Sequence, residues 1–212
     1  MGPPYELFYG LGTGNFEAWM MAFAAEPDYV NALCEKLVDV WIENLRRFSS
    51  AVGNHVQILQ FNDDFGTQSA PFISVKMFRE LIMPHYKRGL DWIHENTEWK
   101  VFLHSDCAIL PLIPSIIEMG VDVLNPIQTS ASGMDPETLK SEFGDQLVFW
   151  GGSLDCQKTL PFGSAEDVRR EVTEHVRIFS PGGGYVFAPV HNIQAGVPAE
   201  NVIAMFDAVL GK

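Results

Sequence analysis

One segment of the sequence, KVFLHSDCAIL at 100–110, carries several chemically reactive side chains at the end of a predicted strand. They are His104, Ser105, Asp106 and Cys107. Imidazole, carboxylate and thiol groups can bind a transition metal, and imidazole and carboxylate can also transfer protons. A second histidine, His191, stands in the segment APVHNIQ near the end of the chain. Together these residue types indicate a catalytic or metal-binding site.

Two histidines and a carboxylate form a donor set that can bind zinc or iron(II) and leave coordination positions open. The candidate metal ligands are His104, Asp106 and His191, with Cys107 as an alternative soft ligand. In a second interpretation the two histidines bind a substrate carboxylate or act as acid and base. His104 and His191 are distant in the sequence, so only the fold can bring them together.

The hydrophobic pattern predicts alternating strands and helices. The expected strands are 55–61, 100–104, 121–125, 147–151 and 185–190. The helices expected after them are 74–96, about 110–119, 136–143, 165–179 and 199–210, and a further helix, 27–48, comes before the first strand. Pro84 is expected to kink or divide the helix 74–96. This alternation predicts an α/β fold with a parallel sheet and helices on its faces.

Ligands of parallel α/β folds bind at the carboxyl ends of the strands. In this sequence each predicted strand ends in polar groups, and the predicted substrate-binding residues among them are Asn62, Asp63, Asn125, Gln128, Gly152 and Asn192. Asp63 and Asp64 are adjacent, so we expect them to point in opposite directions, one into the site and the other toward a loop. The predicted catalytic residues are His104, His191 and Asp64.

Composition excludes several classes of protein. The net charge is −13 with only 14 Lys and Arg residues, which argues against binding to nucleic acid or to an anionic membrane surface. No apolar run is long enough to span a membrane, and the N-terminal residues do not form a signal peptide. Three widely spaced cysteines are typical of a reducing compartment, so we expect a cytoplasmic protein.

Several segments together resemble the uroporphyrinogen decarboxylase superfamily, and most closely its cobamide-dependent methyltransferase branch. They are FNDDFGTQSAPFIS, KVFLHSDCAI, MGVDVLNPIQ, LVFWGGSLDCQ and APVHNIQAGVPAENVIAMF. The resemblance covers about residues 15 to 210. It implies a (β/α)8 TIM barrel with its site at the C-terminal mouth, a fold that usually needs about 250 residues.

Only about five C-terminal βα units of such a barrel are predicted here. We therefore expect residues 1–212 to form a single URO-D-like domain that lacks the N-terminal part of the barrel. A partial barrel leaves strand edges open. It must close differently, pair with another chain as a homo-oligomer or with a missing N-terminal segment, or belong to a longer protein.

The resemblance also suggests a metal site. Zinc-dependent methyltransferases of this family carry His-x-Cys after the same strand and a second Cys after the last strand. In this sequence His104 matches the histidine, while Asp106 and His191 stand at the two cysteine positions. The resemblance therefore implies a donor set that is harder than one histidine and two thiolates.

Three functions remain open at this stage. The first is a metal-assisted methyltransferase that moves a methyl group between a small donor or acceptor and a corrinoid cofactor on a partner protein, with zinc or another divalent transition metal as Lewis acid. The second is a metal-independent decarboxylase of a tetrapyrrole side chain, which needs positive charge to bind carboxylates. The third is a non-catalytic partial barrel that binds a ligand or a partner chain.

Overall fold

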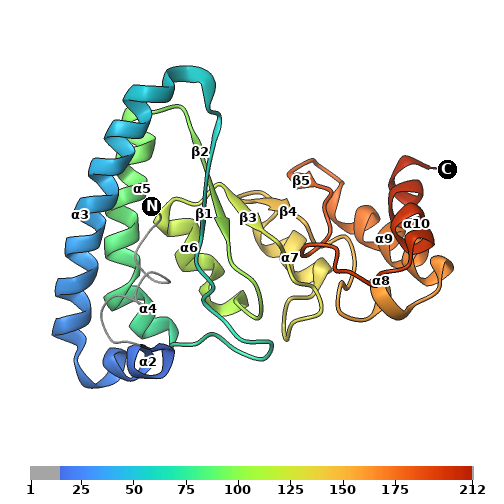
Figure 1. Cartoon of the computed structure of the whole chain (residues 1–212), viewed down its shortest axis with the longest axis horizontal. Coiled ribbons are helices and arrows are strands. Elements are labelled where there is room, and N and C mark those ends of the chain that lie inside the picture. Colours follow the sequence, from blue (N-terminus) through green and yellow to red (C-terminus); the bar gives the residue numbers. More distant parts are fainter. Residues whose placement is uncertain (1–14, 212) are drawn as a thin grey trace.

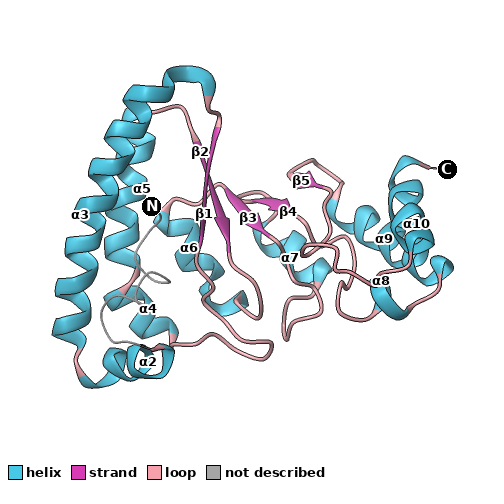
Figure 2. Ribbon diagram, in the orientation of Figure 1, coloured by secondary structure: helices cyan, strands magenta, loops and turns pink. Residues whose placement is uncertain are grey.

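A parallel sheet with strand order β1-β2-β3-β4-β5 runs through the computed structural model, which describes residues 15–211 (Figure 2). The strands are β1 (Ile58–Asn62), β2 (Lys100–His104), β3 (Val123–Asn125), β4 (Val148–Trp150) and β5 (Tyr185–Val186). The register aligns Asn62 with His104, and His104 with Asn125. Consecutive parallel strands in sequence order are the arrangement of a (β/α)8 barrel, so the predicted fold class is confirmed, with five strands of such a barrel present.

The connecting segments are helical (Figure 1). The α-helices are α2 (Phe16–Ala25), α3 (Pro27–Val52), α4 (Val75–Leu81), α5 (Met83–Asn96), α6 (Ile113–Met119), α7 (Pro136–Phe143), α8 (Thr159–Phe162), α9 (Ala165–Phe179) and α10 (Ala199–Leu210), with short 3-10 turns η1 (Gly53–His55) and η2 (Leu110–Leu112). Neighbouring helices contact one another: α3 contacts α5, α5 contacts α6, α7 contacts α9, and α9 contacts α10. Figure 1 shows α3 and α5 side by side along one end of the sheet.

The two faces of the sheet differ in burial at its β1 end, whereas Phe102 and Val123 on the inner face of β2 and β3 are buried. Side chains that point toward the helices, such as Val101, Leu103 and Phe149, are fully buried in the main core. On the other face of β1, the side chain of Ile58 is 41% exposed. Because side chains alternate along a strand, this exposed face corresponds to the inner wall of a barrel.

Most predicted elements are present, with shifted boundaries. The helix expected at 74–96 is divided into α4 and α5 at Ile82, which agrees with Pro84, a residue that cannot donate to the preceding turn. The strand expected at 55–61 starts later, because a 3-10 turn ends at His55. The strand expected at 185–190 has only two paired residues. Helices α2 and α8 were not predicted.

No helix within residues 15–211 has the length and apolar character that a membrane span needs.

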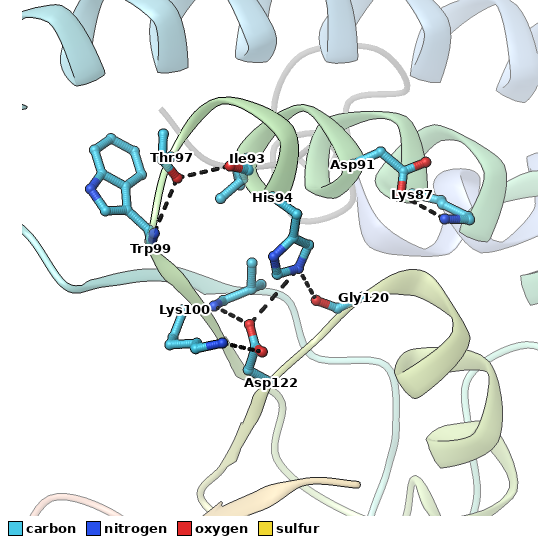
Figure 3. A network of polar contacts seen from close by, with 10 residues as sticks. Lys87, Asp91, Ile93, His94, Thr97, Trp99, Lys100, Gly120 and Asp122 are labelled. Atoms are coloured by element: carbon cyan, nitrogen blue, oxygen red, sulfur yellow. Dashed lines mark hydrogen bonds and ion pairs between the residues drawn. The ribbon is translucent and has the colours of Figure 1, made fainter.

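A polar network holds the amino-terminal edge of the sheet, opposite the candidate site (Figure 3). The carboxylate of Asp122 accepts a 2.8 Å hydrogen bond from the backbone N–H of Val101. The Lys100 ammonium lies 3.5 Å from the same carboxylate, and His94 Nε2 lies 3.8 Å from it. The backbone contact ties the start of β3 to the start of β2.

Replacing Asp122 with alanine is therefore expected to lower the free energy of unfolding by about 1–3 kcal/mol, because the Val101 N–H loses its acceptor. Asp122→Asn keeps an acceptor and loses only partly exposed ion pairs, so it should cost less than about 1 kcal/mol. Urea unfolding of both variants measures the difference. If the two variants were equally destabilised, the charges of Lys100 and His94 would be the dominant contribution instead.

Candidate metal centre

Three side chains with metal-ligating atoms converge at the carboxyl ends of β1 and β2. One ligand atom from each of Asp64, His104 and Asp106 lies within 4.8 Å of the other two, and all three residues are half-buried. Asp64 follows β1 by two residues, whereas His104 is the last residue of β2 and Asp106 follows it. Parallel pairing of β1 with β2 therefore brings two carboxylates and an imidazole together.

The imidazole of His104 is held in one orientation by the neighbouring strand. His104 Nδ1 lies 2.6 Å from Asn125 Oδ1, and the amide nitrogen of Asn125 donates to the backbone carbonyl of Trp150 at 2.8 Å. An amide oxygen only accepts, so Nδ1 carries a proton. In the neutral ring, Nε2 is then the nitrogen with a free lone pair, and it faces Asp106 Oδ2 at 3.3 Å.

The electrostatics of this group follow from its carboxylates. The hydrogen bond to the Asp106 carboxylate raises the pKa of His104, partial burial opposes this shift, and the contact with Asn125 adds to it. Asp64 Oδ1 accepts the backbone N–H of Asp106 at 2.9 Å, which fixes the Asp64 carboxylate beside the turn after β2. A divalent cation would compensate two adjacent carboxylates, so the charge arrangement suits a metal ion.

Asp63 differs from its neighbour Asp64. Its side chain is fully buried and accepts a hydrogen bond from the Tyr86 hydroxyl on α5. Because successive residues of an extended chain point to opposite faces, Asp64 faces the strand ends while Asp63 faces the helices. The structure thus corrects the substrate-binding role that the sequence predicted for Asp63, and Asp63 instead links β1 to α5.

One imidazole nitrogen and two carboxylate oxygens are a suitable donor set for zinc, iron(II) or manganese, with further positions left for substrate or water. The orientation of His104 by Asn125 is the outer-shell support that metal-binding histidines usually have. The residues of this site therefore fit a divalent transition metal.

A cavity of about 350 Å³ lies beside this group. It is lined by Asp64, Gln68, Asp106, Cys107, Gln128, Ser130, Cys156, Gln157, Val190, His191, Asn192 and Gln194. His191 and Asn192 are exposed residues of the loop after β5. They border the cavity, but His191 lies outside the three-residue group formed by Asp64, His104 and Asp106.

The loop after β2 is fixed by amide side chains. Gln128 is buried, and its Oε1 accepts the backbone N–H of Cys107 at 3.0 Å. Its amide nitrogen donates to Gln68 Oε1 at 2.7 Å, and Gln68 in turn donates to the Cys107 thiol at 3.5 Å. Burial, followed by the nearby carboxylates of Asp106 and Asp64, raises the pKa of Cys107, so its thiol stays protonated at neutral pH.

Two further predicted site residues, Asn62 and Gly152, lie at the carboxyl end of β1 and just after β4. Asn62 is exposed at the end of β1 and accepts a 3.2 Å hydrogen bond from the amide of Gln60. Gly152 is buried, and its carbonyl lies 2.7 Å from His175 Nδ1 on α9. Gln68 and Cys156, which the sequence analysis did not include as site residues, also line the cavity. Only the fold could have identified Gln68, since it lies outside any strand end.

A larger hollow of about 1020 Å³ runs along α8 and α9. It is lined by residues of those helices such as Phe162, Glu166 and Arg170, and none of the three candidate metal ligands borders it. We assign the site to the smaller cavity because two of the three candidate ligands, Asp64 and Asp106, line it.

The hydrogen bond between Asn125 and His104 can be tested by substitution. Asn125→Leu keeps a similar shape but removes the acceptor for His104 Nδ1–H, so zinc affinity is expected to fall by about 10–100-fold. Asn125→Asp keeps an acceptor and should retain most of the affinity. Competition titration against a chromophoric chelator measures both variants. Full zinc affinity in Asn125→Leu would show that this hydrogen bond does not orient the ligand.

Comparisons with known proteins agree with this architecture. A sequence model of the family described as Uroporphyrinogen decarboxylase (URO-D) matches residues 2–211. A protein of Psychromonas ingrahamii named uroporphyrinogen decarboxylase is 28% identical over 213 residues, which cover 98% of this chain and 56% of that protein. A protein of the same name from Alkalilimnicola ehrlichii is 33% identical over 70 residues, covering 33% of this chain and 18% of that protein.

A solved structure has a similar fold. It is a methyltransferase from Methanosarcina mazei, with a TM-score of 0.70 and 20% sequence identity, over 98% of this chain and 56% of that one. This chain thus spans about half the length of the Psychromonas ingrahamii protein and of the Methanosarcina mazei methyltransferase. Because the family match extends over nearly the whole sequence and the strand order is that of consecutive barrel units, this chain belongs to the uroporphyrinogen decarboxylase (URO-D) family.

Proposed function

We propose that this chain provides the metal-binding part of a methyltransferase site, at which a methyl group moves between a small molecule and a corrinoid cofactor carried by a partner protein. The observation that carries the proposal is the convergence of Asp64, His104 and Asp106 at the strand ends, with His104 oriented by Asn125. The fold similarity to a methyltransferase is consistent with this assignment.

The charge of the cavity supports the choice of reaction. Among the described residues that line it, Asp64 and Asp106 carry negative charge and no lysine or arginine is present. A tetrapyrrole with several carboxylates would be repelled here, whereas a metal cation and a small neutral substrate would not. This part of the site therefore favours methyl transfer over decarboxylation.

Each residue has a role in the proposal. Asp64, His104 and Asp106 would hold the metal, which when bound would supply Lewis acidity toward a thiol or hydroxyl acceptor or a methoxy oxygen. Gln128 fixes the loop that carries Asp106 and Cys107, and Asn192 borders the cavity, where it can hydrogen-bond substrate. His191 at the rim can accept or donate the acceptor proton.

The free cysteines Cys34, Cys107 and Cys156 suit a reducing cytoplasm, where we place the protein.

Transfer from methylcobalamin tests this proposal. The zinc-loaded chain is mixed with methylcobalamin and a panel of small thiols and alcohols, and loss of the methyl–cobalt bond is followed by visible absorbance. We expect acceptor-dependent demethylation that requires zinc and disappears in His104→Ala. Absence of demethylation with every acceptor, in a sample that binds zinc stoichiometrically, would contradict methyl transfer by this chain.

Decarboxylation is the second candidate, because the curated relatives carry that name. It predicts metal-independent loss of carbon dioxide from uroporphyrinogen. The same protein sample is therefore assayed for that product after treatment with a chelator. Activity that survives the chelator and the His104→Ala change would favour the decarboxylase.

A further inference from the structure

We propose that Gln128 is a positioning residue, which holds the loop after β2 in a left-handed backbone conformation and thereby aims the Asp106 carboxylate toward His104. The inference rests on the metal centre of the proposed function, and it adds a residue that acts through this loop and not as a ligand. Three observations carry it: the backbone angles of two loops, the hydrogen bonds around Asp106, and the burial of Gln128.

Two loops at the carboxyl edge of the sheet contain unusual backbone angles. Within residues 15–211, the non-glycine residues with positive φ are Cys107, at +79°, and Ile127, at +57°. The left-handed region is unfavourable for residues with a Cβ atom, and most of all for a β-branched residue such as isoleucine. Such conformations persist where surrounding contacts enforce them, and they are concentrated at functional sites. Cys107 follows the candidate ligand Asp106, and Ile127 precedes Gln128, so the strain lies beside the ligand and beside the residue that holds it.

Both peptide groups that flank Asp106 are fixed by side chains. The N–H of Asp106 donates to Asp64 Oδ1 at 2.9 Å, and the N–H of Cys107 donates to Gln128 Oε1 at 3.0 Å. Because the two peptide planes beside a residue determine the direction of its Cα–Cβ bond, these hydrogen bonds direct the Asp106 side chain. Its carboxylate lies 3.3 Å from His104 Nε2. Without Gln128 the Cys107 N–H would lose its acceptor, and Cys107 could relax from its left-handed conformation.

Gln128 is itself held between loops. Its side chain is 4% exposed, and its amide nitrogen donates to Gln68 Oε1, in the loop after β1, at 2.7 Å while its Oε1 accepts from Cys107 in the loop after β2. A carboxamide can donate and accept at the same time, which neither a carboxylate nor an apolar side chain can do. Both polar atoms of Gln128 therefore have protein partners, which favours a positioning role over contact with substrate.

The strained turn that carries Gln128 is packed against the loop after β4. The carbonyl of Ile127 accepts from the N–H of Thr129 at 2.9 Å, so Gln128 is the central residue of a tight turn. A Cβ atom at Gly152 would lie 3.0 Å from the Ile127 carbonyl oxygen and 3.1 Å from the Ile127 Cβ, closer than ordinary contact. Since Ile127 is also fully buried, the turn has little room to move, and Gln128 is fixed at its base.

Zinc dissociation constants of single and double variants, measured by competition with a chromophoric chelator, test the proposal. Gln128→Met keeps a side chain of similar shape and removes both hydrogen bonds, so zinc should bind about 10–100-fold more weakly. Adding Cys107→Gly lowers the cost of the left-handed conformation, and should recover about fivefold or more of the lost affinity. Adding Cys107→Ala instead removes the same thiol but keeps a Cβ atom, so it should recover none.

Gln146→Met is the matched control, because Gln146 is exposed in the turn before β4, at the amino edge of the sheet. Its zinc affinity should stay within about twofold of wild type. Wild-type affinity in Gln128→Met, or equal recovery with Cys107→Gly and Cys107→Ala, would overturn the positioning role. If Gln128→Met does not fold, as judged by circular dichroism and thermal unfolding, Gln68→Met replaces it. This change removes the acceptor of the Gln128 amide, should weaken zinc binding about tenfold, and overturns the role if affinity is unchanged.

The outcomes separate this role from the proposed reaction. The expected order of zinc affinities, together with no demethylation of methylcobalamin, would contradict methyl transfer and support the positioning role. Zinc-dependent demethylation with wild-type zinc affinity in Gln128→Met would overturn the positioning role alone. A wild-type chain that binds no zinc would overturn both.

Discussion

Replacing His104 with alanine is expected to weaken zinc binding by more than about a hundredfold, because a direct ligand contributes more than the outer-shell partners whose loss costs about 10–100-fold. His104 supplies the only nitrogen in the group of three, and two carboxylates alone are poor zinc ligands. Elemental mass spectrometry after dialysis should find about one zinc per wild-type chain and nearly none in the variant.

His55→Ala is the matched control. His55 is exposed in the turn before β1, at the amino edge of the sheet and away from the three ligands. Its replacement should leave zinc content unchanged. Equal zinc in the His104→Ala and wild-type samples would mean that zinc binds elsewhere, and would remove the basis for metal-assisted chemistry at this edge.

The second large effect is expected at Gly151, which follows β4. Its φ is +112°, and a Cβ atom at this position would lie 2.2 Å from the carbonyl oxygen of Pro126. Gly151→Ala therefore combines an unfavourable backbone conformation with a clash against backbone, and should lower the free energy of unfolding by about 3 kcal/mol or more. Urea unfolding monitored by tryptophan fluorescence measures the loss.

Gly211→Ala is the control that separates the cost of the backbone conformation from the cost of the clash. Gly211 also has a positive φ, of +68°, but within the described part of the chain no atom beyond its immediate neighbours and the backbone of its own helix lies within 4 Å of a Cβ built there. It should cost about 1 kcal/mol from backbone conformation alone. If Gly151→Ala cost no more than Gly211→Ala, the contact with Pro126 would not contribute to stability. Since Pro126 follows Asn125, the Gly151 variant should also bind zinc more weakly.

The sequence was sufficient for the order of the five strands and for the edge of the sheet at which Asp64, His104 and Asp106 converge. Periodicity placed β2, α7, α9 and α10 within a residue or so, because their apolar spacing and caps are local features. The shortness of β5 was not predictable, because an apolar run such as YVFAPV indicates a buried segment but does not show how many of its residues pair with β4. Helix α2 was missed because its apolar residues do not form a single stripe along the helix.

The composition of the metal group depended on three-dimensional structure. Alternation along an extended chain predicted that Asp63 and Asp64 would point apart, but it could not tell which of the two faces the site. Pairing of β1 with β2 brought Asp64 to His104 and Asp106. His191 lies on a loop after a strand of two residues, and the path of such a loop cannot be read from residue spacing.

The most direct test of the metal centre compares zinc dissociation constants for Asp64→Ala and His191→Ala, measured by competition with a chromophoric chelator. The three-residue group predicts that Asp64→Ala weakens binding by more than about a hundredfold, whereas His191→Ala changes it by less than about threefold. The reverse order, with loss of zinc in His191→Ala and wild-type affinity in Asp64→Ala, would contradict the assignment of Asp64, His104 and Asp106 as the metal ligands.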